Sequence, residues 1–255
     1  MHAKIEELTK IRVGAVNYLN TKPLLYGIER SAALQNQMHL IQDYPARIAN
    51  LLLSKEIDIG LAPVAVILKL AESHIITDYC IGADGPVASV CIYSTQPFES
   101  IDTLLLDYQS RTSVNLCKVL LRHYWKRAIK LVNTTTEFSD QIVSNTAGLL
   151  IGDRALAFNR QALYKYDLAE IWKEMTGLPF VFAVWVSNKA VPEAFISLFN
   201  KENKTGLDNI DEVIAEQGNI PFDLHTYYKK NISYQLDEEK KKGLHLFLEL
   251  MKENE

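Results

Sequence analysis

From residue 11 onward, short apolar segments alternate with stretches whose apolar residues recur at helical spacing, and this alternation constrains the fold most. Residues 11–16, 39–42 and 57–61 are short and apolar, as expected for strands. Helical stretches follow Pro23, Pro45 and Pro63, and proline fits the first turn of a helix. The succession predicts an α/β fold with a mostly parallel, doubly wound sheet.

The middle of the chain repeats this pattern. Residues 87–93, 103–106 and 148–151 are predicted strands. A helix is then expected from Asp167, an N-cap with Glu170 three residues later, to Gly177, which favours a helix end. Residues 179–186 read PFVFAVWV and predict a strand buried on both faces. Helices are expected beyond Pro192.

Two apolar strands are candidates for crossing between two lobes. Residues 87–93 would leave the first lobe, and residues 181–187 would return to it. This arrangement predicts a discontinuous first α/β domain of residues 1–92 plus 187–255 and a second domain of residues 93–186. Two α/β lobes connected in this way would enclose a cleft.

Charge and composition exclude several classes of function. The formal net charge of −4 and the pI of about 5.9 give no basic footprint for nucleic acid or anionic lipid. The basic run at residues 240–242 follows three acidic residues and indicates charge pairing along a helix. The sequence contains neither a secretory signal nor an apolar run long enough to span a membrane, so we expect a cytoplasmic protein. Cys80, Cys91 and Cys117 are expected to be reduced and buried.

Common cofactor and catalytic motifs are missing from the sequence. There is no P-loop, no G-x-G-x-x-G, no G-x-S-x-G and no H-E-x-x-H. The six histidines are scattered singly, without metal-ligand spacing. We therefore expect neither a metal nor a cofactor.

Polar residues cluster instead where predicted strands end, the edge at which doubly wound folds bind ligands. Asn17, Tyr18, Asn20 and Thr21 follow the first strand and can donate hydrogen bonds to an oxygen-rich ligand. Ordinary turn formation and helix capping would use the same residue types. The local pattern leaves both interpretations open.

A second cluster, Ser110-Arg111-Thr112-Ser113, precedes a predicted amphipathic helix. A guanidinium, three hydroxyls and the free N–H groups of a helix start together form a good carboxylate or phosphate pocket. The alternative is a plain Ser/Thr cap beside a surface arginine.

For three single residues, the local pattern does not decide between a structural and a ligand-binding role. Ser89 lies in an apolar strand, where a hydroxyl more often bonds to backbone than to ligand. Asp153 follows the strand at residues 148–151 and could cap a helix, pair with a neighbour or orient a ligand. Trp185 is predicted to be a core residue.

Taken together, five segments occur in order: VGAVNYLNTKPL, DIGLAPVA, SRTSVNL, LLIGDRAL and YDLAEIWKEMTGLPFVFAVW. They resemble the successive motifs of the chorismate dehydratase family, which opens the futalosine route to menaquinone. The resemblance extends from about residue 11 to residue 187 and includes ISYQLDEEKKKGLHLF near the end. It implies a type II periplasmic-binding-protein-like fold with a cleft between two lobes. It also implies loss of water from chorismate, a dicarboxylate, to give 3-[(1-carboxyvinyl)oxy]benzoate.

The resemblance assigns roles to individual residues. It places the catalytic positions at Asn20 and Ser89. Substrate contacts are expected from Ser110, Arg111, Thr112 and Ser113, which would hold a carboxylate, and from Asn17, Tyr18 and Asp153. The base is left as either Asp153 or the enolpyruvyl carboxylate of the substrate itself.

Three other functions fit the same fold. A solute-binding protein would capture a small anion without reaction but would be expected to carry a secretory signal. The related 1,4-dihydroxy-6-naphthoate synthase typically begins with a Ser-Pro motif, where this chain has VNYLNTKPL. A ligand-sensing module would need a DNA-binding domain, for which the sequence offers no candidate. The oligomeric state is left open.

Overall fold

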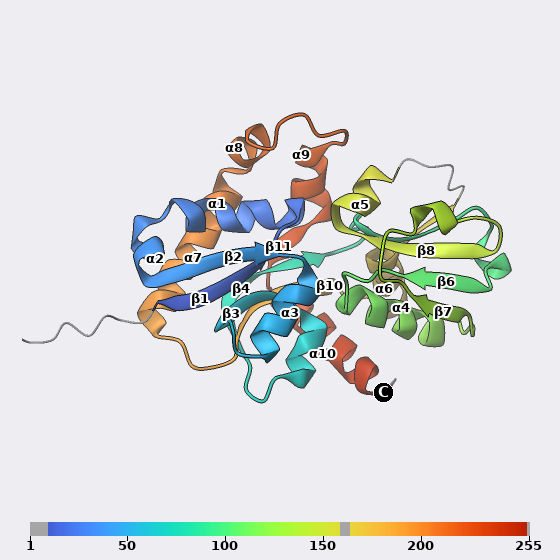
Figure 1. The fold of residues 1–255 in the computed structure, drawn as a ribbon, viewed down its shortest axis with the longest axis horizontal. Coiled ribbons are helices and arrows are strands. Elements are labelled where there is room, and N and C mark those ends of the chain that lie inside the picture. Colours follow the sequence, from blue (N-terminus) through green and yellow to red (C-terminus); the bar gives the residue numbers. More distant parts are fainter. Residues whose placement is uncertain (1–9, 159–163, 254–255) are drawn as a thin grey trace, which may run out of the picture.

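A computed structural model describes residues 10–158 and 164–253 of the chain. The described strands form two sheets, one in each of two lobes (Figure 1). The sheet of the first lobe contains β1 (Ile11–Val16), β2 (Met38–Asp43), β3 (Ile59–Pro63), β4 (His74–Ala83), β10 (Phe180–Ser187) and β11 (Ser233–Gln235). Their order is β11-β4-β10-β3-β1-β2, with β1 parallel to β2 and β3, and β10 antiparallel to β3 and β4.

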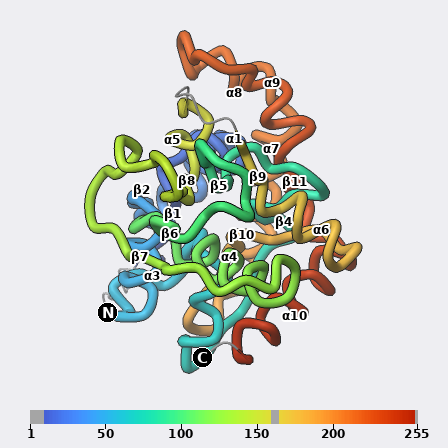
Figure 2. Tube along the Cα trace, turned by 90° about the vertical axis from the view of Figure 1, so that its right-hand side faces the viewer, coloured from blue at the N-terminus to red at the C-terminus, as the bar shows by residue number. Residues whose placement is uncertain are grey.

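Both sheets mix parallel and antiparallel pairs, so the prediction of a mostly parallel sheet was wrong. The sheet of the second lobe contains β5 (Val90–Ser94), β6 (Thr103–Leu106), β7 (Lys130–Asn133), β8 (Thr146–Ile151) and β9 (Tyr164–Asp167). The order is β7-β6-β8-β5-β9; β6 is parallel to β7 and β8, and β5 is antiparallel to β8 and β9. Figure 2 shows these strands, in green and yellow, in front of the first lobe.

Helices cover both faces of the sheets. In the first lobe α1 and α7 lie on one face and α3 and α10 on the other, and in the second lobe α5 lies opposite α4 and α6 (Figure 1). The described α-helices are α1 (Lys22–Arg30), α2 (Ala32–Gln37), α3 (Pro45–Leu53), α4 (Thr112–His123), α5 (Gly152–Ala157), α6 (Leu168–Thr176), α7 (Glu193–Asp208), α8 (Ile210–Ala215), α9 (Leu224–Thr226) and α10 (Glu238–Lys252). Shorter 3-10 helices lie at Leu19–Thr21, Val64–Lys69, Phe98–Ser100 and Ser139–Gln141, and a π-helix at Tyr227–Asn231.

Local sequence rules hold well in two elements. The Asp167 carboxylate caps α6 by accepting hydrogen bonds from the backbone N–H groups of Ala169 and Glu170, and Gly177 ends the helix at φ 74°. The strand predicted from PFVFAVWV is buried along its entire length as β10. Both predictions are confirmed, because caps and unbroken apolar runs are decided by neighbouring residues.

Several smaller predictions are also settled. Cys80, Cys91 and Cys117 are buried free thiols, as expected, and burial raises the pKa of Cys80 and Cys117 to about 12.

The predicted charge pairing in α10 is confirmed by the ion pairs Glu238–Lys241 and Glu239–Lys242. Trp185 is a core residue, and its Nε1 donates to the Asn203 side chain at 2.9 Å.

The prediction of a helix after Pro63 was only partly right. A short 3-10 helix ends at Lys69, and the chain then forms β4, which the sequence pattern did not predict. Strands β7, β9 and β11 were also missed. These strands are decided by pairing with distant partners: β4 with β10, and β11 with β4.

The chain crosses between the lobes twice. β4 of the first lobe leads to β5 of the second, and α6 leads back to β10. The predicted boundary after residue 186 puts most of β10 in the second lobe, whereas its hydrogen bonds to β3 and β4 place it in the first sheet. A fully buried strand fits either sheet equally well in sequence. We propose that the first lobe resumes at β10.

Among the residues that the structure describes, no helix combines the length and apolar character needed to cross a membrane. The predicted absence of a secretory signal concerns the first nine residues, which lie outside the described residues.

A buried carboxylate, Asp58, just before β3, pairs with half-exposed cations of β1 and of the segment after β10. The Asp58 carboxylate accepts hydrogen bonds from the Arg12 backbone N–H at 2.9 Å and the Arg12 guanidinium at 2.7 Å, and it lies 2.9 Å from Lys189 Nζ. Burial acts to raise the pKa of Asp58, but these bonds hold it well below its usual value. The carboxylate therefore stabilises the fold in its charged form.

Replacing Asp58 with asparagine is expected to lower the free energy of unfolding at pH 7 by about 1–3 kcal/mol. Because the native pKa is depressed, this contribution is present above the unfolded pKa of about 4 and is lost as pH falls toward the native value. Urea denaturation of both proteins at pH 7 and pH 3 should show the difference shrinking in acid. A pH-independent difference would contradict the assignment.

Candidate functional site

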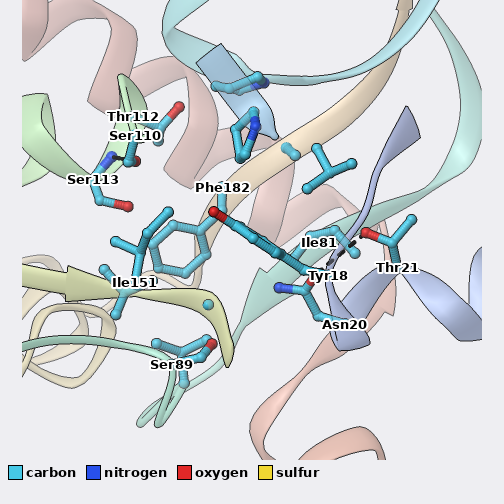
Figure 3. Close-up of a pocket in the computed structure, with 17 residues that line it drawn as sticks. Tyr18, Asn20, Thr21, Ile81, Ser89, Ser110, Thr112, Ser113, Ile151 and Phe182 are labelled. Carbon is cyan, nitrogen blue, oxygen red and sulfur yellow. Dashed lines mark hydrogen bonds between the residues drawn. The ribbon is translucent and has the colours of Figure 1, made fainter. Parts of the chain in front are cut away.

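A small cavity of about 60 Å³ lies between the two lobes (Figure 3). Its polar lining comes from both lobes: Tyr18, Asn20, Thr21, Ser89, Ser110, Thr112 and Ser113. The apolar part includes Ile81, Val87, Ile151 and Phe182. None of the described residues that line the cavity is charged. A ligand held here would be bound by neutral hydrogen-bonding groups.

The wall from the first lobe is built where β1 ends. The chain turns through the 3-10 helix Leu19–Thr21 directly into α1, so Asn20 is held at the mouth of a helix. Thr21 Oγ1 donates to Asn20 Oδ1 at 3.3 Å, and Tyr234 Oη donates to the Asn20 main-chain oxygen at 2.9 Å. Figure 3 shows the Asn20 amide nitrogen directed into the cavity. Asn20 is therefore placed to donate to a bound ligand.

Ser89 also lines the cavity and lies in the connection between β4 and β5. The preceding Ala88 has φ 65°, a left-handed conformation that is uncommon for residues other than glycine. Asp167 accepts the Ala88 backbone N–H at 2.7 Å, and the Ser89 carbonyl accepts the Gly152 N–H at 2.8 Å. Such backbone conformations persist where surrounding contacts fix them and cluster at functional sites. These bonds fix Ser89 at the cavity.

The Ser110–Ser113 cluster lies at the start of α4. Ser110 Oγ accepts the Ser113 backbone N–H at 3.0 Å, and Thr112 Oγ1 accepts the Ala65 N–H of the first lobe at 3.3 Å. The positive end of the α4 dipole therefore faces the cavity through Thr112 and Ser113. Free N–H groups and hydroxyls at a helix start form an anion site.

Arg111, which was expected to hold a substrate carboxylate, does not line the cavity. Its Nη2 donates to Asn50 Oδ1 on α3 at 2.5 Å, so the side chain joins the two lobes instead of lining the cavity. Its neighbours in the sequence face the cavity because consecutive residues of a helical turn point in different directions.

Asn17 and Asp153 also lie outside the cavity lining. Asn17 is exposed and accepts a hydrogen bond from Lys22 Nζ at 3.0 Å. The Asp153 carboxylate accepts the backbone N–H of Leu19 at 3.1 Å, which connects the lobes. Burial raises the pKa of Asp153, partly offset by the Leu19 hydrogen bond. In this position Asp153 fastens the Asn20 segment to the second lobe.

Tyr18 lies across the cavity, between Asn20 and the hydroxyls of the Ser110–Ser113 cluster (Figure 3). Its hydroxyl donates to Gln109 Oε1 of the second lobe, and burial raises its pKa above the usual range for tyrosine. The ring packs on Gly152, which has φ 59° and where an added Cβ would come within 2.9 Å of the ring. Tyr18 is therefore a neutral group held by both lobes.

Sequence reasoning missed two residues of the site. Phe182 lines the cavity, and Tyr227 lies behind it, with its hydroxyl donating to Ser89 Oγ at 2.8 Å. Gly152, which also lines the cavity, stands in the LLIGDRAL motif beside Asp153. Tyr227 is 138 residues from Ser89 and has no local signal.

The cavity is small and lined by neutral hydrogen-bonding and apolar groups. Small-molecule pockets usually measure about 300–1,000 Å³, so this cavity must widen to admit a ligand. The lobes are joined by hydrogen bonds from Leu19 to Asp153, from Ala65 to Thr112 and from Arg111 to Asn50. Throughout the described part of the chain, no group of three His, Cys, Asp or Glu residues is arranged to hold a metal ion.

Comparison with known proteins identifies the family. The family model described as menaquinone biosynthesis matches residues 11–253. The chain belongs to this family. One relative is the chorismate dehydratase of Thermus thermophilus. It is 27% identical over an alignment of 270 positions, which covers 94% of each chain.

Solved structures place this family member in a known fold. A Candida albicans protein described as having the generic periplasmic binding protein fold matches with a TM-score of 0.68 at 13% identity, covering 96% of this chain and 90% of that one. The alkanesulfonate-binding protein SsuA of Xanthomonas axonopodis pv. citri, bound to MOPS, matches with a TM-score of 0.62 at 13% identity, covering 97% and 93%. The predicted periplasmic-binding-protein-like fold is confirmed.

Proposed function

We propose that this protein is a chorismate dehydratase, a cytoplasmic lyase that removes water from chorismate to give 3-[(1-carboxyvinyl)oxy]benzoate in menaquinone biosynthesis. One observation carries the proposal: Asn20 and Ser89, which are 69 residues apart in the sequence, line the same uncharged cavity beside the start of α4. The Thermus thermophilus relative supports the choice of reaction. The cavity suits a small dianion bound through neutral donors.

Each carboxylate of chorismate has a partner in the proposed complex. One is held by the Thr112 N–H and the hydroxyls of Thr112 and Ser113 at the start of α4, where Ser110 supports the turn by accepting the Ser113 N–H. Asn20 and Ser89 donate to the other carboxylate or to the departing ring hydroxyl. Lobe closure excludes water and fixes this geometry.

The reaction breaks one C–H bond and the neighbouring C–O bond of the ring. The ring hydroxyl leaves and combines with the proton as water, and the ring becomes aromatic. Asp153, the carboxylate that the sequence offered as base, is held by the Leu19 N–H outside the cavity lining. The enolpyruvyl carboxylate of the substrate therefore serves as the proton acceptor in this proposal, and the protein contributes positioning and stabilisation of charge.

Replacing Asp153 with asparagine separates these two bases. Asparagine keeps an acceptor oxygen for the Leu19 N–H but cannot take a proton, so we expect kcat to fall by less than about tenfold, as for loss of a charge-assisted hydrogen bond. The measurement is steady-state turnover of chorismate by the variant and the wild type. Near-total loss of turnover with retained substrate binding would contradict substrate-assisted catalysis.

The function itself is tested by incubating the purified protein with chorismate and following the products by chromatography and mass spectrometry. We expect an aromatic product lighter than chorismate by one water. Intact chorismate that protects the protein against heat would instead support an anion-binding protein, a use of this fold exemplified by SsuA. If chorismate neither reacts nor binds, the related 1,4-dihydroxy-6-naphthoate synthase becomes the leading candidate.

A further inference from the structure

Tyr227 contacts one of the two side chains on which the proposed function depends and lies beside the other. Its hydroxyl donates to Ser89 Oγ at 2.8 Å, and the Asn20 side chain is near enough to influence its pKa. Asn20 and Ser89 both line the cavity. The Tyr227 side chain is only 2% exposed, so its hydroxyl is committed to Ser89 and not to solvent.

The backbone at Tyr227 is unusual. Residues Tyr227–Asn231 form a π-helix, closed by a hydrogen bond from the Ile232 N–H to the Tyr227 carbonyl at 3.0 Å. Single π turns are rare and are frequent at functional sites. This turn buries the consecutive side chains of Tyr227 and Tyr228, each 2% exposed. The chain thus adopts a rare geometry at the point where it supplies the hydroxyl behind the cavity.

Hydrogen-bond counting shows what this contact does to Ser89. A serine hydroxyl has one proton and two lone pairs. When Tyr227 donates into one lone pair, the proton of Ser89 stays available for another acceptor, and Ser89 lines the cavity. Thr21 donates to Asn20 Oδ1, so the Asn20 amide nitrogen is left for the cavity. By donating to Ser89, Tyr227 leaves the Ser89 proton for the same space.

We propose that Tyr227 is a positioning residue that orients the Ser89 hydroxyl toward the bound ligand. This inference rests on the proposed function, because it assigns that donor to chorismate. Burial raises the pKa of Tyr227 far above its usual value, so the phenol stays protonated across the working pH range. Tyr227 acts through Ser89 and does not exchange a proton with the substrate.

Tyr227→Phe removes only the hydroxyl and is the direct test. We expect kcat for chorismate to fall by about 10- to 100-fold, as for misplacement of a catalytic group, with KM changed by less than about threefold. The pH profile of the remaining activity should keep its shape. A loss that appears in KM alone, or a shifted pH profile, would overturn the positioning role.

Tyr228→Phe is the matched control. Tyr228 lies in the same π-helix, is equally buried, and its hydroxyl finds no partner among the described residues. We expect wild-type turnover and an equal or higher melting temperature for this variant. Equal losses of activity in both variants would mean that the π-helix is merely structural support, which contradicts the inference.

A double variant separates positioning from a general effect. If Tyr227 acts through Ser89, adding Tyr227→Phe to a Ser89→Ala variant should lower kcat little further, since the effects of coupled residues are not additive. If the fall in kcat of the double variant equals the product of the two single falls, the proposal is overturned. Crystal structures of the wild type and Tyr227→Phe give a readout without chorismate: the Ser89 rotamer should change. An inactive wild type would refute the proposed function alone, whereas unchanged side chains would refute this inference.

Discussion

Replacing Asn20 with aspartate is expected to reduce kcat/KM for chorismate by roughly 10³-fold. The substitution keeps the shape of the side chain but exchanges an N–H donor for a negative oxygen. Loss of one positioned donor typically costs about 10²–10³-fold in rate, and a carboxylate would in addition repel a dianionic substrate. The cavity offers no charged residue in its lining to offset that repulsion. Steady-state kinetics with chorismate would measure the loss.

The matched control for this variant is Asn17→Asp. It makes the same chemical change three residues earlier, at an exposed side chain outside the cavity lining. An exposed charge changes interaction free energies by at most about 1 kcal/mol, so the turnover of Asn17→Asp should stay within about fivefold of the wild type. If both variants lost activity equally, the whole segment would contact the substrate, and the assignment to Asn20 would be wrong.

Replacing Gly206 with alanine is expected to destabilise the protein by about 3 kcal/mol or more. Gly206 of α7 faces α1, and an added Cβ would lie 1.8 Å from the Pro23 carbonyl oxygen. The contact is reciprocal, because a Cβ at Gly27 of α1 would lie 2.3 Å from the Glu202 carbonyl oxygen. The two helix backbones touch directly, so neither can accept a methyl group without separating.

Urea denaturation of the Gly206→Ala variant measures this effect, and its sign is informative. In an unconstrained helix, glycine to alanine stabilises by about 1 kcal/mol. A stabilised variant would show that α1 and α7 can separate freely. Ser197→Ala, at an exposed position of the same helix, is the control and should be nearly neutral. We also expect Gly206→Ala to lower activity, because α1 follows directly after Asn20.

The sequence predicted the parts of this structure that depend on neighbouring residues. The cap at Asp167, the helix end at Gly177 and the buried strand β10 all follow from short-range chemistry. Strand β4 was missed, since its place between β10 and β11 depends on partners about a hundred residues or more away. The same distance explains why β10 could not be assigned to a lobe from sequence.

The site divides in a similar way. The sequence by itself determined which segments carry polar residues at strand ends, and their order along the chain determined the family. Only the tertiary structure decided which side chains face the cavity: Ser110, Thr112 and Ser113 do, whereas Arg111 turns to Asn50. It also brought Tyr227 to Ser89. The physical reason is that side-chain direction and contacts between lobes depend on how two sheets close on each other, which no local pattern encodes.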